Sequence, residues 1–486
     1  MPQESLRYKT ILLDKALPYL LLLLGALLRL KVLIENRSIF IDEANLARNL
    51  SERTIGGFFE KLEYGQHAPP LFMLESKMVT QILGNYEWAL RLTPFVAGLG
   101  TLWILWELLR EWIQSPIVRL YGLSLFCFSI FGIQYSTEFK QYSSDAFLAL
   151  AYISIAWHDR AMPFRGWQII KWMLLGGIGL WYSMPLVFVL SGVGLFFLWK
   201  ERKQDWVYLS PVFLGWLLSF AAYYFLVLQH SIGTTHLEQH FELYFFNVTS
   251  LSEEAWANNF KLITELFRNV SDKSAVSIGF TILMFLFGIY HLAKNNKLKG
   301  LFLIVPILLM FVASIFHYYN LMGRLTVFAL PLITLTICIC LDRLWMSSHK
   351  WIKGIVGILI IFGMVNKKGL DFFTEKMTFE EIKPCLVILS EQSKDQDFLY
   401  IDHEAAPAFY YYLNNYENPF QVKGTIKLGQ WDESPPTALR SDGNNTWVLF
   451  SHASDTKINS YLDQMSVSAE EKICQSPTVQ LIRLNR

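Results

Sequence analysis

The chain has 486 residues, of which 53% are hydrophobic, 15% aromatic and only 17% charged. This composition excludes an ordinary soluble globular protein and indicates a polytopic membrane protein. The formal net charge of +1 implies no basic face, so nucleic acid is excluded as a partner.

Apolar runs long enough to cross the hydrocarbon of a bilayer recur along the first 366 residues, and we expect about eleven spans. The first run lacks the small-residue cleavage site of a signal peptide and is long enough to span, so we expect it to remain in the protein. The runs lie near 16–34, 89–108, 117–134, 142–157, 168–183, 185–199, 207–228, 276–293, 300–317, 325–341 and 351–366.

Basic residues gather in every second connection between these runs, from Arg7 and Lys9 at the start to Arg343 and Lys350 near the end. Cytoplasmic connections are the ones enriched in lysine and arginine. We therefore expect an integral protein of the plasma (inner) membrane with its N-terminus in the cytoplasm. An odd number of spans then places the C-terminal part outside.

Two of the outer connections are long, at 35–87 and 229–274. The first is predicted to hold helices near 42–62 and 71–83, and the second an amphipathic segment near 252–268. Loops of this length in a compact membrane protein are usually functional or lie along the interface.

After residue 366 the composition becomes mixed and polar, which divides the chain into a transmembrane domain, 1–366, and an extracytoplasmic domain, 367–486. Its alternating strands and helices predict a small α/β domain with a parallel core. It has no glycine-rich phosphate loop, so no cofactor is assigned to it. Cys385 and Cys474 lie in this domain, and their spacing leaves a disulfide between them open. Strands are expected at 398–401, 446–450 and 479–483, and helices at 379–392, 403–413 and 455–465.

Asp42 and Glu43 follow the first apolar run directly, and two interpretations of this acidic pair stay open. Acidic residues favour the first turn of a helix, where Asp42 would serve as a cap. Alternatively, one carboxylate is a general base that removes a proton from an attacking hydroxyl or amine. The spacing alone does not decide between them.

Four further polar side chains lie in outer connections and are candidates for a binding site. His67 precedes two prolines, and it is either simply exposed or contacts a phosphate or a metal ion. Glu138 and Lys140 crowd a short loop, where unpaired charge at membrane depth is costly, so we expect them to pair with each other, with headgroups or with a ligand. Arg324 lies in an outer connection, although basic residues are usually concentrated on the cytoplasmic side. It either reaches for headgroups or clamps a phosphate.

The order of these short motifs resembles that of the polyprenyl-phosphate-sugar-dependent glycosyltransferases of the GT-C superfamily. This superfamily includes protein O-mannosyltransferases, bacterial aminoarabinose transferases and the related family-39 and Rgt-type enzymes. The resemblance extends over residues 1–366 and includes a trailing extracytoplasmic domain. The motifs are the Asp42-Glu43 pair, His67-Ala-Pro-Pro-Leu-Phe72, Ala89-Leu-Arg-Leu-Thr-Pro94, Tyr135-Ser-Thr-Glu-Phe-Lys-Gln-Tyr142, and Gly323-Arg324 with Pro331.

The resemblance implies that Asp42 is the catalytic acid position with Glu43 in support, and that Arg324 lies near the phosphate of the donor. Glu138 matches an acidic residue that in some relatives organises a metal or the acceptor. Some aminoarabinose transferases have Glu-Lys before the paired prolines, where this chain has His67-Ala68. The lysine contact to phosphate is thus missing here, and Lys140 or Arg324 would supply its charge. A divalent metal held by Glu138 or His67 stays open, and no other cofactor is expected.

The function implied is that of an inverting glycosyltransferase. It would move a hexose or pentose from a polyprenyl-phosphate carrier to a lipid, glycan or protein acceptor on the outer face of the membrane. Two rivals are a transporter or flippase of a lipid-linked or polar solute, and an inactive membrane scaffold. Transporters often show internal symmetry, which this sequence lacks.

Overall fold

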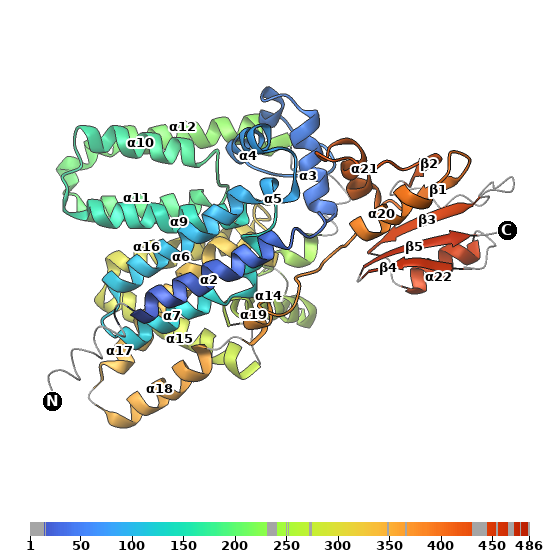
Figure 1. The fold of residues 1–486 in the computed structure, drawn as a ribbon. Helices are drawn as coiled ribbons and strands as arrows, with labels where there is room; N and C mark the ends of the chain where they lie inside the picture. The colour runs from blue at the N-terminus through green and yellow to red at the C-terminus, as the bar shows by residue number, and fades with distance from the viewer. Residues whose placement is uncertain are drawn as a thin grey trace.

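The computed structural model describes a helical bundle joined to a small sheet domain (Figure 1). Part of the second long outer loop, residues 231–240, lies outside the described residues. The described residues are 14, 16–230, 241–248, 250, 252–271, 275–347, 349–364, 367–429, 445–452, 455–464, 471–476 and 478–484.

Each of the eleven expected spans contains a helix, because each apolar run favours a structure that satisfies its own backbone hydrogen bonds. Among the described residues, five segments are long and apolar enough to cross a membrane: Leu17–Ile34, Leu92–Trp112, Ala275–Asn295, Lys297–Ile315 and Gly323–Trp345. The helices are α2 (Leu17–Ile34), α6 (Leu92–Trp112), α7 (Pro116–Cys127) with α8 (Ile130–Tyr135), α9 (Tyr142–His158), α10 (Trp167–Gly179), α11 (Leu186–Lys200), α12 (Ser210–Leu226), α15 (Ala275–Asn295), α16 (Lys297–Ile315), α17 (Leu330–Trp345) and α18 (Lys350–Met364).

Helix α17 runs through the centre of the bundle, and every residue from Leu330 to Leu341 is buried. Its sequence is apolar on all sides, which is typical of a helix surrounded by other helices. The hydroxyls of Thr334 and Thr336 donate to backbone carbonyls one turn earlier, so they add no unpaired polar group to the core. A 3-10 segment, Gly323–Ala329, leads into α17, so this rigid central helix holds Arg324 at one of its ends.

The first long outer loop forms three helices: α3 (Ile41–Glu52), α4 (Pro70–Leu83) and α5 (Glu87–Leu90). Helix α3 is shorter than the predicted 42–62. It ends at Glu52 because the ammonium group of Lys77, on α4, donates to the carbonyls of Leu50 and Arg53 and satisfies the end of the helix. The amphipathic segment of the second outer loop forms α14 (Glu253–Ser271), as expected.

The C-terminal domain contains a five-stranded sheet, in the order β2-β1-β3-β5-β4. The predicted parallel core is only partly correct. Strand β1 pairs in parallel with β2 and β3, whereas β5 pairs antiparallel with β3 and β4. The short connection between β4 and β5 suits only an antiparallel pair. Strands β2 and β4 were not predicted; all four residues of β2 are exposed. The elements are α19 (Lys367–Asp371), α20 (Lys383–Gln392), β1 (Phe398–Ile401), α21 (Ala406–Asn414), β2 (Thr425–Leu428), β3 (Thr446–Ser451), α22 (Asp455–Gln464), β4 (Glu471–Gln475) and β5 (Val479–Leu484).

A disulfide joins Cys385 on α20 to Cys474 on β4, with their Cα atoms 5.6 Å apart. The sequence left this bond open, because connectivity depends on which segments the fold brings together. The bond closes a loop with a sequence separation of 89 residues. Disulfides typically stabilise a domain by about 2–4 kcal/mol, and longer loops give the larger effects.

The C-terminal domain packs directly on α3, with α21 lying beside it (Figure 1). The backbone N–H of Ile41, at the start of α3, donates to the carboxylate of Glu380 at 3.1 Å. The N–H of Ile39 donates to the hydroxyl of Tyr412, on α21. The residue that caps α3 is Phe40, whose side chain accepts no hydrogen bond. The C-terminal domain therefore supplies the acceptors for the start of α3, and Asp42 does not act as a cap.

Candidate active site

Asp42 and Arg324 are far apart in the sequence but form an ion pair, with 2.5 Å between Oδ2 of Asp42 and a terminal guanidinium nitrogen of Arg324. Asp42 lies in the first turn of α3, and Arg324 precedes α17. The two side chains are 27% and 28% exposed, so solvent and ligands reach both. The fold thus brings together the acid and the guanidinium that the sequence singled out.

Asp42 is held in its ionised form. Burial opposes ionisation, but the positive charges of Lys140 and Arg324 and hydrogen bonds from Arg324 and Gln66 outweigh it and hold the pKa of Asp42 below its ordinary value. Before any ligand arrives, the carboxylate is therefore free of a proton and able to accept one. The Asp42 carboxylate becomes more basic if Lys140 or Arg324 moves away from it.

Lys140 is the second cation of this group, and it is buried in the loop between α8 and α9. Its ammonium group donates to the side-chain carbonyl of Gln66 at 2.6 Å. Gln66 directly precedes His67, so the lysine approaches the segment in which some relatives have their own lysine. That Lys140 supplies the missing charge to a phosphate stays a prediction.

Glu43 points away from this group and is completely buried. Its two carboxylate oxygens accept from Nε of Arg91 at 2.8 Å and from a terminal nitrogen of Arg91 at 2.6 Å. One of them also accepts the backbone N–H of Phe139 at 2.6 Å. Glu43 thus joins α3 to the start of α6 and to the loop of Lys140. Arg91 was not predicted, although it lies within the quoted Ala89–Pro94 motif, because a sequence does not reveal which acid an arginine will meet.

Replacing Glu43 by Gln should destabilise the protein strongly, because the change leaves the Arg91 guanidinium buried without its counter-charge. Breaking a buried pair in this way typically costs about 3–5 kcal/mol. Thermal unfolding of the purified protein would show the loss as a marked fall in melting temperature. Glu63→Gln is the matched control, because Glu63 pairs with Arg53 while 67% exposed, and exposed pairs contribute little. Equal melting temperatures for the two variants would contradict a structural role for Glu43.

Glu138 lies behind these groups, fully buried, and accepts a hydrogen bond from Gln134 at 3.2 Å. Burial, and then the negative charge of Glu43, raise the pKa of Glu138 to about 7. His67 is exposed, and its backbone carbonyl accepts a bond from Gln141. In the part of the chain that the structure describes, neither Glu138 nor His67 belongs to a group of three side chains that are able to hold a metal ion.

A cavity of about 220 Å³ opens beside Arg324. It combines aromatic rings with a second guanidinium, that of Arg268 on α14, which was not predicted as a site residue. The sequence pointed to Arg268 only through the amphipathic pattern of residues 252–268, which end at this arginine. Arg268 pairs with the carboxylate of Glu265 at 3.7 Å, so Arg324 is the cation of this cavity that a phosphate would reach first. The aromatic surface beside it suits an apolar chain attached to that phosphate. The lining residues are Phe131, Tyr135, Tyr244, Glu265, Arg268, Asn269, Met322, Gly323 and Arg324.

Comparisons with known proteins identify a related family and a related fold. Residues 67–228 match the family model described as dolichyl-phosphate-mannose-protein mannosyltransferase. No curated protein matches the chain. The crystal structure of ArnT from Cupriavidus metallidurans bound to undecaprenyl phosphate is similar at a TM-score of 0.53 and 11% identity, over 96% of this chain and 97% of that one. The apo structure of the same protein gives a TM-score of 0.52 and 12% identity over the same shares.

At this identity the likeness to ArnT shows a common fold, and it extends over nearly the whole of both chains. The shared fold includes the C-terminal sheet domain, which confirms the predicted fold class. The family match independently covers the segment from His67 to the end of α12. The apolar helices of the bundle account for a membrane location. The chain therefore shares the fold of ArnT, and over residues 67–228 it is similar to the dolichyl-phosphate-mannose-protein mannosyltransferase family.

Proposed function

We propose that this protein transfers a sugar from a polyprenyl-phosphate carrier to an acceptor on the outer face of the membrane, with inversion at the anomeric carbon. The observation that carries the proposal is the contact between Asp42 and Arg324 at the edge of the cavity. In this proposal Asp42 is the base, and its ion-pair partner Arg324 is the cation that binds the donor phosphate. The structure of ArnT with undecaprenyl phosphate supports a lipid phosphate as the carrier.

The resting ion pair suggests how donor binding prepares the base. A donor phosphate that enters the cavity competes with Asp42 for Arg324, whose planar fork suits the two phosphate oxygens. Because Arg324 is one of the causes that hold the pKa of Asp42 low, sharing it with phosphate makes the carboxylate more basic. The base therefore becomes effective once the donor is in place.

The transfer itself is a single displacement. Asp42 accepts the proton of the acceptor hydroxyl or amine, whose lone pair forms a new bond to the anomeric carbon from the face opposite the phosphate. The bond between the anomeric carbon and the phosphate oxygen breaks, and its electron pair leaves with polyprenyl phosphate. Arg324 and Lys140 are already in place to stabilise the charge that develops on the leaving group. Glu43 and Arg91 hold α3 so that Asp42 faces this position.

Action on the outer face, with a cytoplasmic N-terminus, is part of the same proposal. The disulfide between Cys385 and Cys474 supports it, because such bonds persist in oxidising compartments outside the cytoplasm. The basic connections between the spans point in the same direction.

The test is transfer by the purified full-length protein in lipid nanodiscs. Polyprenyl-phosphate donors carrying labelled hexoses or pentoses are offered with lipid, glycan and peptide acceptors, and the expected product has the opposite anomeric configuration. A product with retained configuration would contradict the single displacement. Polyprenyl phosphate alone should also bind. A protein that binds no polyprenyl phosphate and transfers no label from any donor would be better described as a scaffold.

A further inference from the structure

The carboxyl ends of β1 and β3 lie side by side in the C-terminal sheet. Strand β1 is flanked by β2 on one side and β3 on the other, and both pair with it in parallel. After β1 the chain forms β2 on one side of β1, and it then crosses to form β3 on the other side of β1. In open sheets of this kind, ligands bind outside the carboxyl ends of the strands at such a reversal.

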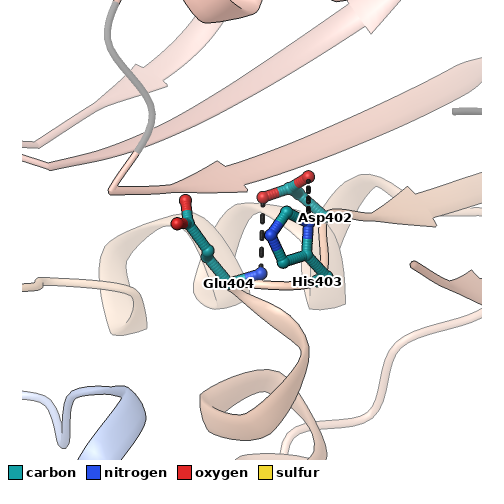
Figure 2. A group of neighbouring side chains, drawn as sticks. All are labelled: Asp402, His403 and Glu404. Carbon is teal, nitrogen blue, oxygen red and sulfur yellow. Dashed lines mark hydrogen bonds and ion pairs between the residues drawn. The ribbon is translucent and has the colours of Figure 1, made fainter. Parts of the chain in front are cut away.

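Three consecutive side chains with metal-binding atoms follow β1 at this edge: Asp402, His403 and Glu404 (Figure 2). One potential ligand atom from each lies within 4.8 Å of the other two. Oδ1 of Asp402 is 3.2 Å from Nδ1 of His403. Metal–ligand bonds of about 2.0–2.2 Å place neighbouring ligand atoms about 3.0–3.5 Å apart. The Asp402–His403 separation already falls in that range.

The carboxylate of Asp402 supplies an independent observation. Its side chain is completely buried, and Oδ2 accepts the backbone N–H of Glu404 at 3.3 Å (Figure 2). Oδ1 lies at ion-pair distance from Nδ1 of His403, 3.2 Å, but accepts no hydrogen bond. A buried carboxylate oxygen without a donor is costly unless a cation neutralises it. This atom is therefore directed at the position that a metal ion would take.

We propose that Asp402, His403 and Glu404 bind one divalent transition-metal ion, of which Zn²⁺ is the best fit. An imidazole combined with carboxylates favours zinc-class ions over Mg²⁺ or Ca²⁺, which prefer oxygen alone. Three protein ligands leave a coordination position open for water or for an oxygen atom of a bound molecule. The site is separate from the earlier candidates Glu138 and His67.

The proposed site lies on the side of the C-terminal domain that faces α3. His452, which follows the neighbouring strand β3, contacts Glu380 at 3.0 Å, and the same carboxylate oxygen accepts the N–H of Ile41. Ile41 directly precedes Asp42. One carboxylate, that of Glu380, therefore joins the end of β3 to the start of α3.

The experiment measures zinc binding by the full-length protein, with any histidine tag removed and bound metal stripped with a chelator. Titration calorimetry with ZnCl2, and metal content after gel filtration, should both give one ion per chain. His403→Gln and Glu404→Gln should each weaken binding at least tenfold. Asp395→Asn is the matched control, because this carboxylate is exposed on the same domain and should leave the affinity unchanged.

Two outcomes would overturn the proposal: no zinc bound by the wild-type protein, or equal affinity in the wild type and both variants. Glu138→Gln and His67→Gln provide a further arm, since loss of binding in these variants alone would place the ion at the membrane site instead. Melting temperatures and the intact disulfide show whether each variant is folded. None of these readouts needs sugar transfer, so the result is independent of the proposed function.

Discussion

Replacement of Asp42 by Asn is expected to lower the rate of sugar transfer by about 10²–10⁴-fold, the usual contribution of a positioned general base. Asparagine has nearly the same shape but does not take a proton from the acceptor. The carboxylate pairs with Arg324 and interacts with Lys140 at a partly exposed position, so we expect its loss to cost less stability than the loss of the fully buried Glu43. Initial rates with labelled donor, measured next to melting temperatures, separate lost chemistry from lost folding.

The Asp42→Asn variant should also keep its affinity for polyprenyl phosphate, or bind it more tightly, because Arg324 loses the partner with which a phosphate must compete. Binding of the carrier lipid by the variant is therefore a readout that a misfolded protein would fail. Asp395→Asn, an exposed change on the C-terminal domain, controls for the loss of one negative charge. Transfer at the wild-type rate by Asp42→Asn would remove Asp42 from the catalytic role.

Replacement of Arg324 by Ala is expected to weaken the binding of polyprenyl phosphate by about 2–3 kcal/mol, which corresponds to about 30- to 150-fold. Arg324 lines the cavity and is the cation in direct contact with Asp42. Arg324→Lys keeps the charge but loses the planar fork that lets one side chain reach Asp42 and two phosphate oxygens. Its affinity should therefore fall between those of the wild type and the alanine variant.

The matched control for these variants is Arg343→Ala. Arg343 is an exposed arginine in the last turn of α17, whereas Arg324 lies in the 3-10 segment that precedes the first turn of this helix. The Arg343→Ala variant should bind polyprenyl phosphate as tightly as the wild type. If the loss of any positive charge from the bundle weakened carrier binding, Arg343→Ala and Arg324→Ala would both bind more weakly. Unaltered carrier affinity in Arg324→Ala would place the donor phosphate elsewhere.

The sequence by itself determined the parts of this protein that depend on local patterns. Each apolar run became a helix, because a backbone surrounded by apolar groups must satisfy its hydrogen bonds within its own segment. The apolar strands β1, β3 and β5 were also predicted, since their alternation with helices follows local periodicity. The candidate residues Asp42, Lys140 and Arg324 were chosen from charge at membrane depth and from the order of short motifs.

The tertiary structure alone decided which of these residues meet. Asp42 and Glu43 are neighbours in the chain, yet the turn of α3 directs one toward Arg324 and the other toward the buried Arg91. The pairing of Cys385 with Cys474, and the capping of α3 by Glu380, likewise join segments far apart in the sequence. Contacts of this kind depend on how helices and strands pack in three dimensions. Local patterns specify which face of an element is apolar, but not which distant side chain will lie against it.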